Sequence, residues 1–191
     1  PAALASACAE RGMALIHLST DYVFDGSKAG PWTPDDPVAP LGTYGFSKAA
    51  GEVAVRQRLE RHLILRTAWV HSIHGNNFVK TMLRVGAERD QLNVVGDQIG
   101  GPTAARDIAA AIVELTERIA DGRARFGTYH FCGQPAASWW DFAQSVFELS
   151  APVWGRRPAV AEITSDEWPT PVARPANSVL DFTALIRDHG V

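Results

Sequence analysis

Short, mostly apolar runs along the chain alternate with longer segments in which apolar residues recur every three or four positions. The runs at 13–18 and 62–67 have the length of strands, and Ser or Thr residues lie at or just after their ends, which is typical of buried parallel strands. Helices are predicted at 2–11, 43–59, 77–89, 103–121, 138–147 and 181–189. Further strands are predicted at 92–95, 127–133 and 160–163. This order of elements predicts an α/β fold with a parallel sheet.

Polar residues that favour helix starts precede several of these helices. Side-chain oxygens of Ser, Thr, Asn and Asp accept hydrogen bonds from the free N–H groups of a first turn. The residues expected to cap helices in this way are Thr43, Asn77, Thr103 and Ser138.

A proline-rich segment at 25–43 separates the first strand from the next helix. Prolines at positions 31, 34, 37 and 40 exclude a helix there and predict an extended loop. A loop of this length in a compact domain is usually functional. Its individual residues are equally consistent with a simple surface connection.

Composition narrows the classes of function. Apolar residues make up 46% of the chain and charged residues 20%, with a net charge of -3. Such a balance offers no basic field for nucleic acid or for a membrane surface, so neither partner is expected. No apolar run has the length of a membrane span and no signal peptide is recognisable, which predicts a cytoplasmic protein. His71 and His74 have no third ligand at metal-binding spacing, so no metal site is predicted.

Candidate chemistry lies in Tyr44 and Lys48, with Thr20 upstream. Residues four apart on a helix share one face, and a nearby ammonium favours the ionised form of a phenol. Such a tyrosine can give a proton to a carbonyl oxygen that is being reduced. Thr20 follows a predicted parallel strand, where catalytic groups of open α/β sheets lie. Taken alone, the Tyr–Lys pair is more often a solvated surface pair.

Further motifs accompany these residues in a fixed order. They are STDYVFDG at 19–26, PLGTYGFSK at 40–48, LRTAWV at 65–70, NNFVKTML at 76–83, VVGDQ at 94–98 and RPANS at 174–178. Together they resemble the extended short-chain dehydrogenase/reductases, and the resemblance covers nearly the whole chain. It implies the C-terminal part of a Rossmann-type, doubly wound parallel sheet with a smaller mixed α/β substrate-binding lobe. Residues 1–75 and about 103–121 would form the Rossmann part, and about 76–102 and 122–191 the lobe.

The resemblance also implies a reaction, which is reduction of the 4-keto group of a 4-keto-6-deoxy sugar carried on dTDP, with NADPH or NADH as cofactor. The implied catalytic residues are Thr20, Tyr44 and Lys48. The implied cofactor contacts are Tyr44, Lys48, Thr67 and Ala68. The implied contacts to the dTDP-sugar are Asp21, Tyr22, Trp69, Asn77, Gln98 and Arg174, although a lone Trp is as often a core residue and an Asn at a helix start a cap.

Several expectations qualify this assignment. No Gly-x-Gly-x-x-Gly turn follows a strand, so the glycine-rich half of the family is expected to be missing from this sequence, and the fragment alone is expected to be inactive. The resemblance implies a homodimer. Some family dimers bind Mg²⁺ through glutamates, but Arg106 near that region argues against a metal here. Two alternatives stay open: a reductase or epimerase for another nucleotide sugar, and a non-catalytic regulatory homologue.

Overall fold

Three parallel strands form the centre of the larger lobe in the computed structural model, which describes all 191 residues. Their order is β1 (Leu15–Thr20), β2 (His62–Thr67) and β7 (Gly127–His130). The register pairs Leu15 with His62 and Thr20 with Thr67, so β1 and β2 end together. Their carboxyl ends therefore form one edge of the sheet.

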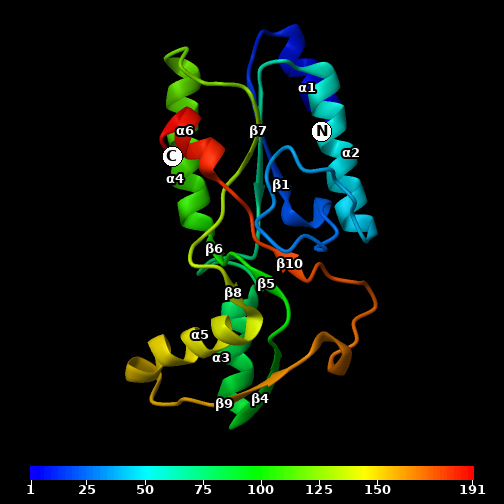
Figure 1. Cartoon of the computed structure of the whole chain (residues 1–191). Coiled ribbons are helices and arrows are strands. Elements are labelled where there is room, and N and C mark those ends of the chain that lie inside the picture. The colour runs from blue at the N-terminus through cyan, green and yellow to red at the C-terminus, as the bar shows by residue number, and fades with distance from the viewer.

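Helices cover both faces of this sheet (Figure 1). Successive strand residues point to opposite faces. Ile64 packs with α1 (Ala2–Glu10) and α2 (Thr43–Arg58), whereas Leu63 and Leu65 pack with α4 (Ala105–Ala120) and α6 (Thr183–His189). The apolar run of β2 is buried from end to end because both of its faces are covered.

The smaller lobe pairs two helices with a two-stranded sheet. It contains α3 (Phe78–Glu88), α5 (Trp139–Trp154), and the parallel strands β4 (Gln91–Val95) and β9 (Ala159–Ile163). Gly86 allows α3 to approach α5, since a Cβ there would lie 2.7 Å from the ring of Phe147. The core of this lobe consists of Met82, Leu92, Val94, Ala143, Val146 and Phe147.

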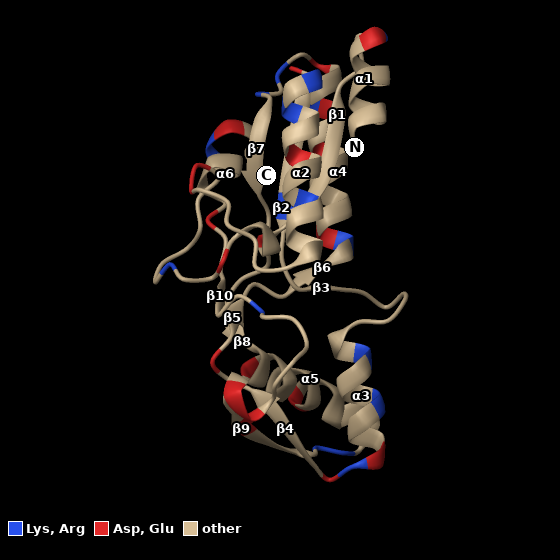
Figure 2. Ribbon diagram, turned by 90° about the vertical axis from the view of Figure 1, so that its right-hand side faces the viewer, with Lys and Arg blue, Asp and Glu red and all other residues tan.

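Short strands lie between the two lobes. β3 (Val70–His71) pairs with β6 (Thr103–Ala104), and β5 (Ile99–Gly100) lies between β8 (Ala137–Ser138) and β10 (Asn177–Ser178). Two 3₁₀ turns complete the fold, η1 (Asp21–Val23) after β1 and η2 (Ser165–Glu167) after β9. Charged residues of both signs occur on both lobes (Figure 2). None of the helices combines the length and the apolar character that crossing a membrane requires.

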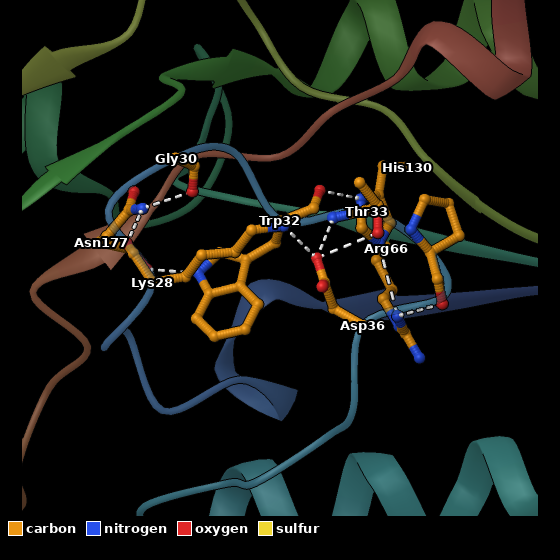
Figure 3. A network of polar contacts seen from close by, with 9 residues as sticks. Lys28, Gly30, Trp32, Thr33, Asp36, Arg66, His130 and Asn177 are labelled. Atoms are coloured by element: carbon orange, nitrogen blue, oxygen red, sulfur yellow. Dashed lines mark hydrogen bonds and ion pairs between the residues drawn. The ribbon is translucent and has the colours of Figure 1, made fainter.

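The proline-rich segment contains no helix between residue 25 and the start of α2 at Thr43, as predicted, and polar contacts hold it against β7 and β10 (Figure 3). The Asn177 amide donates to the carbonyl oxygens of Lys28 and Gly30 at 2.7 and 2.9 Å. The ring of His130 meets the Trp32 carbonyl oxygen at 3.0 Å. Hydrogen bonds to β7 and to β10 therefore hold the loop in place.

Arg66 is buried beneath this loop and donates a hydrogen bond to its Pro34 carbonyl oxygen. Its guanidinium donates two hydrogen bonds to the Glu52 carboxylate, at 2.9 and 2.7 Å, and lies 5.0 Å from the centroid of the Phe24 ring. Phe24 in turn stacks on Trp32 with centroids 4.4 Å apart. The ion pair thus connects α2 and β2 with the aromatic residues that begin the loop.

Two of the four predicted caps are confirmed and two are wrong. Asn77 accepts a hydrogen bond from Lys80 N–H, and Ser138 forms a full capping box. Thr43 instead lies inside α2, whose cap position is Gly42. Thr103 lies in β6, because its hydroxyl donates to the Gly101 carbonyl oxygen and accepts the Gly133 N–H.

Two segments lie in a different lobe from the one expected. Residues 122–191 were assigned to the substrate lobe, yet β7 pairs with β2 in the larger sheet and α6 packs against β7. Leu185 of α6 is fully buried with Leu63 and Leu115. Burial of these apolar side chains, for which the sequence gives no partner, places both segments in the larger lobe.

Candidate active site

Two threonines end adjacent strands at one edge of the sheet. Thr20 is the last residue of β1, Thr67 is the last of β2, and the register places them opposite each other. Both are buried, and Thr67 Oγ1 has no hydrogen-bond partner. Ligands of open α/β sheets bind outside the carboxyl ends of the strands. This edge is therefore where a ligand would meet the sheet.

The first turns of α2 bring Tyr44 and Lys48 to the same edge. Lys48 Nζ donates a hydrogen bond to the Leu18 carbonyl oxygen at 2.7 Å, near the end of β1. Tyr44 is 58% exposed, and its ring lies edge-on to that of Tyr22, with centroids 5.8 Å apart. Gly45 permits this approach, because a Cβ there would lie 2.2 Å from the Tyr22 carbonyl oxygen. An exposed phenol and an ammonium thus stand beside the end of β1.

The turn after β1 buries a carboxyl group. Thr20 Oγ1 lies 2.9 Å from Asp21 Oδ1 and accepts the Tyr22 N–H at 3.2 Å. Burial raises the pKa of Asp21 to about 6, although the nearby hydroxyl groups of Ser178 and Thr20 act in the opposite direction. Burial also raises the pKa of Tyr22, with a further contribution from the charge of Asp21, while the charge of Arg174 lowers it. Arg174 therefore lies close enough to act on the strand edge electrostatically.

Trp69 connects this edge with the smaller lobe. It follows β2 with a backbone φ of 49°, a left-handed conformation that is rare for a bulky residue. Its ring stacks on Trp139 of α5, with centroids 3.5 Å apart and planes inclined by 8°. A Cβ at Gly100 would lie 2.5 Å from the Trp69 ring, so only glycine fits there. The packing of Trp139 and Gly100 around Trp69 holds this strained conformation.

A cleft of about 330 Å³ opens beside this aromatic stack in the smaller lobe. Gln98 and Arg174 lie in its wall, and the Gln98 amide donates to Ser165 Oγ at 2.9 Å. The apolar part of the lining includes Phe78, Met82, Val94, Val95, Trp139 and Trp168. Aromatic walls with few polar groups are typical of sites for planar ligands. One exposed arginine at the wall adds a group that can pair with an anion.

The family model described as the RmlD substrate binding domain matches residues 1–191. The chain belongs to this family. The match confirms the family resemblance that the motifs predicted.

Two similar proteins are named for the same enzymatic activity. The chain is 45% identical to a dTDP-4-dehydrorhamnose reductase from Aggregatibacter actinomycetemcomitans, covering 98% of this chain and 65% of that protein. It is 46% identical to one from Sinorhizobium fredii, covering 99% of this chain and 64% of that protein. The chain therefore spans slightly less than two thirds of the length of these relatives.

Solved structures of the family have the same fold. A crystal structure of a dTDP-4-dehydrorhamnose reductase from Clostridium acetobutylicum superposes with a TM-score of 0.89 at 38% identity, covering 97% of this chain and 62% of that one. A Bacillus anthracis reductase in complex with NADP gives 0.88 at 34% identity, covering 97% and 63%. The predicted α/β, Rossmann-type fold class is confirmed.

The predicted site residues of this RmlD-type chain fall into two groups. Those at the strand edge are Thr20, Asp21, Tyr22, Tyr44, Lys48 and Thr67, and those in the cleft wall are Gln98 and Arg174. Ala68 is buried in an apolar cluster with Val23 and Cys132, so only its backbone can meet a ligand. Asn77 caps α3 and donates to the Ser72 carbonyl oxygen at 2.6 Å, and it is not among the residues that line the cleft.

Sequence reasoning missed most of the cleft lining. Phe78 and Trp139 lie in the predicted helices at 77–89 and 138–147 and were not named as site residues, yet both line the cleft. Trp168 and Thr170 lie in a segment without a recognisable element and carried no signal. The signal that could have found Trp139 is its place at the start of a helix, next to the Ser138 cap. No group of three or more His, Cys, Asp or Glu side chains is arranged to hold a metal ion.

The strand edge suits the nicotinamide end of the implied cofactor. A nicotinamide riboside presents ribose hydroxyls and an amide, which need both donors and acceptors. Lys48 and the exposed Tyr44 offer donors there, and the buried Thr67 hydroxyl lacks a partner. The residues present therefore fit this end of the cofactor.

Proposed function

We propose that this chain carries the substrate site and the catalytic edge of a reductase that converts dTDP-4-dehydro-L-rhamnose to dTDP-L-rhamnose with NADPH or NADH. The observation that carries the proposal is the arrangement of Thr20, Tyr44 and Lys48 at one strand edge, joined through stacked tryptophans to a cleft with Arg174. The names of the RmlD-family relatives give the same substrate and reaction.

The strand edge provides the groups that a carbonyl reduction needs. When bound, a reduced nicotinamide supplies the hydride for C4 of the sugar. Tyr44 gives a proton to the carbonyl oxygen, since its phenol is exposed beside the end of β1. Lys48, held by the Leu18 carbonyl, keeps a positive charge near that phenol. Thr20 offers a second hydrogen bond to the same oxygen, so the developing charge meets two fixed donors.

The cleft provides the binding energy for the nucleotide. Phe78, Trp139 and Trp168 form aromatic walls against which a thymine can stack, and stacking of a base on an aromatic ring contributes about 1–3 kcal/mol. Arg174 is placed to pair with the diphosphate, because it lies both in the cleft wall and near Tyr22. The sugar then points toward the strand edge, past Trp69.

A panel of nucleotide sugars tests the proposal in the full-length protein. Oxidation of NADPH is followed at 340 nm with dTDP-4-dehydro-L-rhamnose, with its GDP and UDP counterparts, and with the free sugar. The proposal is supported if the dTDP compound is turned over at least ten-fold faster than each of the others. Faster turnover of another nucleotide sugar assigns the site to a different reductase or epimerase, and binding without turnover of any sugar assigns it to a regulatory homologue.

Association of two copies is a further prediction from the family resemblance, and a cytoplasmic location is a further prediction from the sequence. Sedimentation velocity tests the first directly, because a dimer has twice the mass of the single chain. Fractionation of cells that produce the protein tests the second.

A further inference from the structure

The Thr20 hydroxyl has one proton, which it can donate either to Asp21 or to a ligand. A hydroxyl donates one hydrogen bond and accepts two. The Tyr22 N–H, at 3.2 Å, occupies one acceptor position of Oγ1. Asp21 Oδ1 lies 2.9 Å from the same oxygen. The direction of the Thr20–Asp21 hydrogen bond therefore decides what remains for a ligand.

The two protonation states of Asp21 give opposite directions. An ionised carboxylate only accepts, so the Thr20 proton points to Asp21 and a lone pair is left toward the substrate oxygen. A protonated carboxyl can donate to Thr20 Oγ1, which leaves the Thr20 proton available. A carbonyl oxygen that gains negative charge is stabilised by a donor and repelled by a lone pair. Only the protonated state makes Thr20 useful in the proposed reaction.

The surroundings of Asp21 shift its equilibrium toward the protonated state. The residue is 3% exposed, and its second carboxyl oxygen, Oδ2, is buried without a hydrogen-bond partner. Its neighbours are hydroxyl groups, from Thr20 and from Ser178 of β10, and no Lys or Arg pairs with it. The titratable groups that interact with it are Tyr22 and the Cys132 thiol, and its charge raises the pKa of both. Burial raises the pKa of Asp21 itself to about 6.

We propose that Asp21 is a positioning residue, which donates to Thr20 when protonated and so directs the Thr20 proton at the substrate carbonyl oxygen. Ionisation of Asp21 reverses this hydrogen bond and removes the second donor from the site. The inference rests on the proposed function, because it assigns a state to one of its donors. It differs from the contact to the sugar that the family resemblance implies for Asp21, since it acts through Thr20.

The first test follows the protonation of Asp21 without any turnover. The carboxyl carbons of aspartates are labelled with ¹³C in this chain and titrated by NMR, with Asp21→Asn identifying the signal. The signal is expected to titrate near pH 6. Thr20→Val removes a donor to the carboxylate, so the midpoint should rise. Ser178→Ala removes the other neighbouring hydroxyl and is the control. It shows how far the Asp21 midpoint moves when a hydroxyl other than that of Thr20 is lost. A midpoint near the ordinary value, or one that Thr20→Val leaves unchanged, overturns the inference.

The second test reads the pH profile of kcat in the full-length protein. Between pH 6 and 8 the active, protonated fraction of Asp21 falls by about 50-fold, and kcat should fall with it. Asp21→Asn supplies a permanent donor to Thr20, so this decline should disappear and kcat at pH 8 should exceed that of the unmodified protein. A decline that persists in Asp21→Asn, or a loss of rate at every pH with dTDP binding intact, contradicts the inference. Failure of the proposed function alone would leave the NMR result unchanged.

Discussion

Replacement of Glu52 by Gln is the most informative perturbation of the buried ion pair. Glu52 is fully buried and Arg66 is 2% exposed, with two hydrogen bonds of 2.9 and 2.7 Å between them. Burial alone would raise the pKa of Glu52, yet the hydrogen bonds and charge of Arg66 lower it below its ordinary value. The carboxylate is therefore ionised, and it is the main compensation for the buried guanidinium.

The magnitude follows from what the substitution leaves behind. Glu52→Gln keeps the shape of the side chain but removes the charge that Arg66 needs, and an uncompensated buried charge costs about 3–5 kcal/mol. Since domains are stable by only about 5–15 kcal/mol, this loss is about a fifth of the total free energy of unfolding or more. The loop that rests on Arg66 through the Pro34 carbonyl oxygen should loosen as well.

Urea unfolding followed by circular dichroism measures this loss. Arg56→Gln is a matched control, because Arg56 contacts the same carboxylate at 3.2 Å but is 36% exposed. Exposed pairs contribute about 1 kcal/mol or less, so the control should change stability little. The double variant Glu52→Gln/Arg66→Met should recover part of the loss, since it leaves no buried charge. A loss below about 1 kcal/mol for Glu52→Gln would refute the account of the ion pair.

Three further outcomes are expected. Burial and the charge of Arg66 lower the pKa of His130 to about 4. Between pH 6.5 and 4 the unfolded chain therefore takes up a proton at this residue that the folded chain does not. In urea unfolding, the free energy of unfolding of the unmodified protein should fall by about 3 kcal/mol more than that of His130→Gln over this range. Trp139→Leu should weaken dTDP binding by roughly ten-fold or more in calorimetric titration, because a stacking surface worth about 1–3 kcal/mol is lost; Trp140→Leu, outside the cleft lining, should leave it unchanged. Ser138→Ala removes the capping hydroxyl of α5 and should cost about 1 kcal/mol of unfolding free energy.

Local pattern was sufficient where one short segment determines its own structure. The segment at 62–67 predicts β2 residue for residue, because the apolar run Leu63–Leu65 at its centre is typical of a strand buried on both faces. Asn77 and Ser138 cap helices as expected, since the cap needs only its own first turn. The strand edge with Thr20 follows from the rule that parallel strands carry sites at their carboxyl ends.

Tertiary contacts decided the rest. Thr103 does not cap a helix, because it lies in β6 and its hydroxyl is engaged by the Gly101 carbonyl oxygen and by the N–H of Gly133, 30 residues away. Trp69 stacks on Trp139, 70 positions along the chain, and no spacing in the sequence predicts this contact. The burial of Asp21 depends on β10 closing over it with Ser178, a strand of two residues near the end of the chain.

The role proposed for the Tyr44 phenol, as the proton donor in carbonyl reduction, is tested most directly by kcat of Tyr44→Phe in the full-length protein. NADPH and dTDP-4-dehydro-L-rhamnose are the substrates, and the dissociation constants of both are measured as well. The exposed phenol makes no hydrogen bond within the chain, so its loss should not disturb the fold. If Tyr44 is the proton donor, kcat falls by about 100-fold or more while both dissociation constants stay within a few-fold. A loss of kcat smaller than about ten-fold would contradict it.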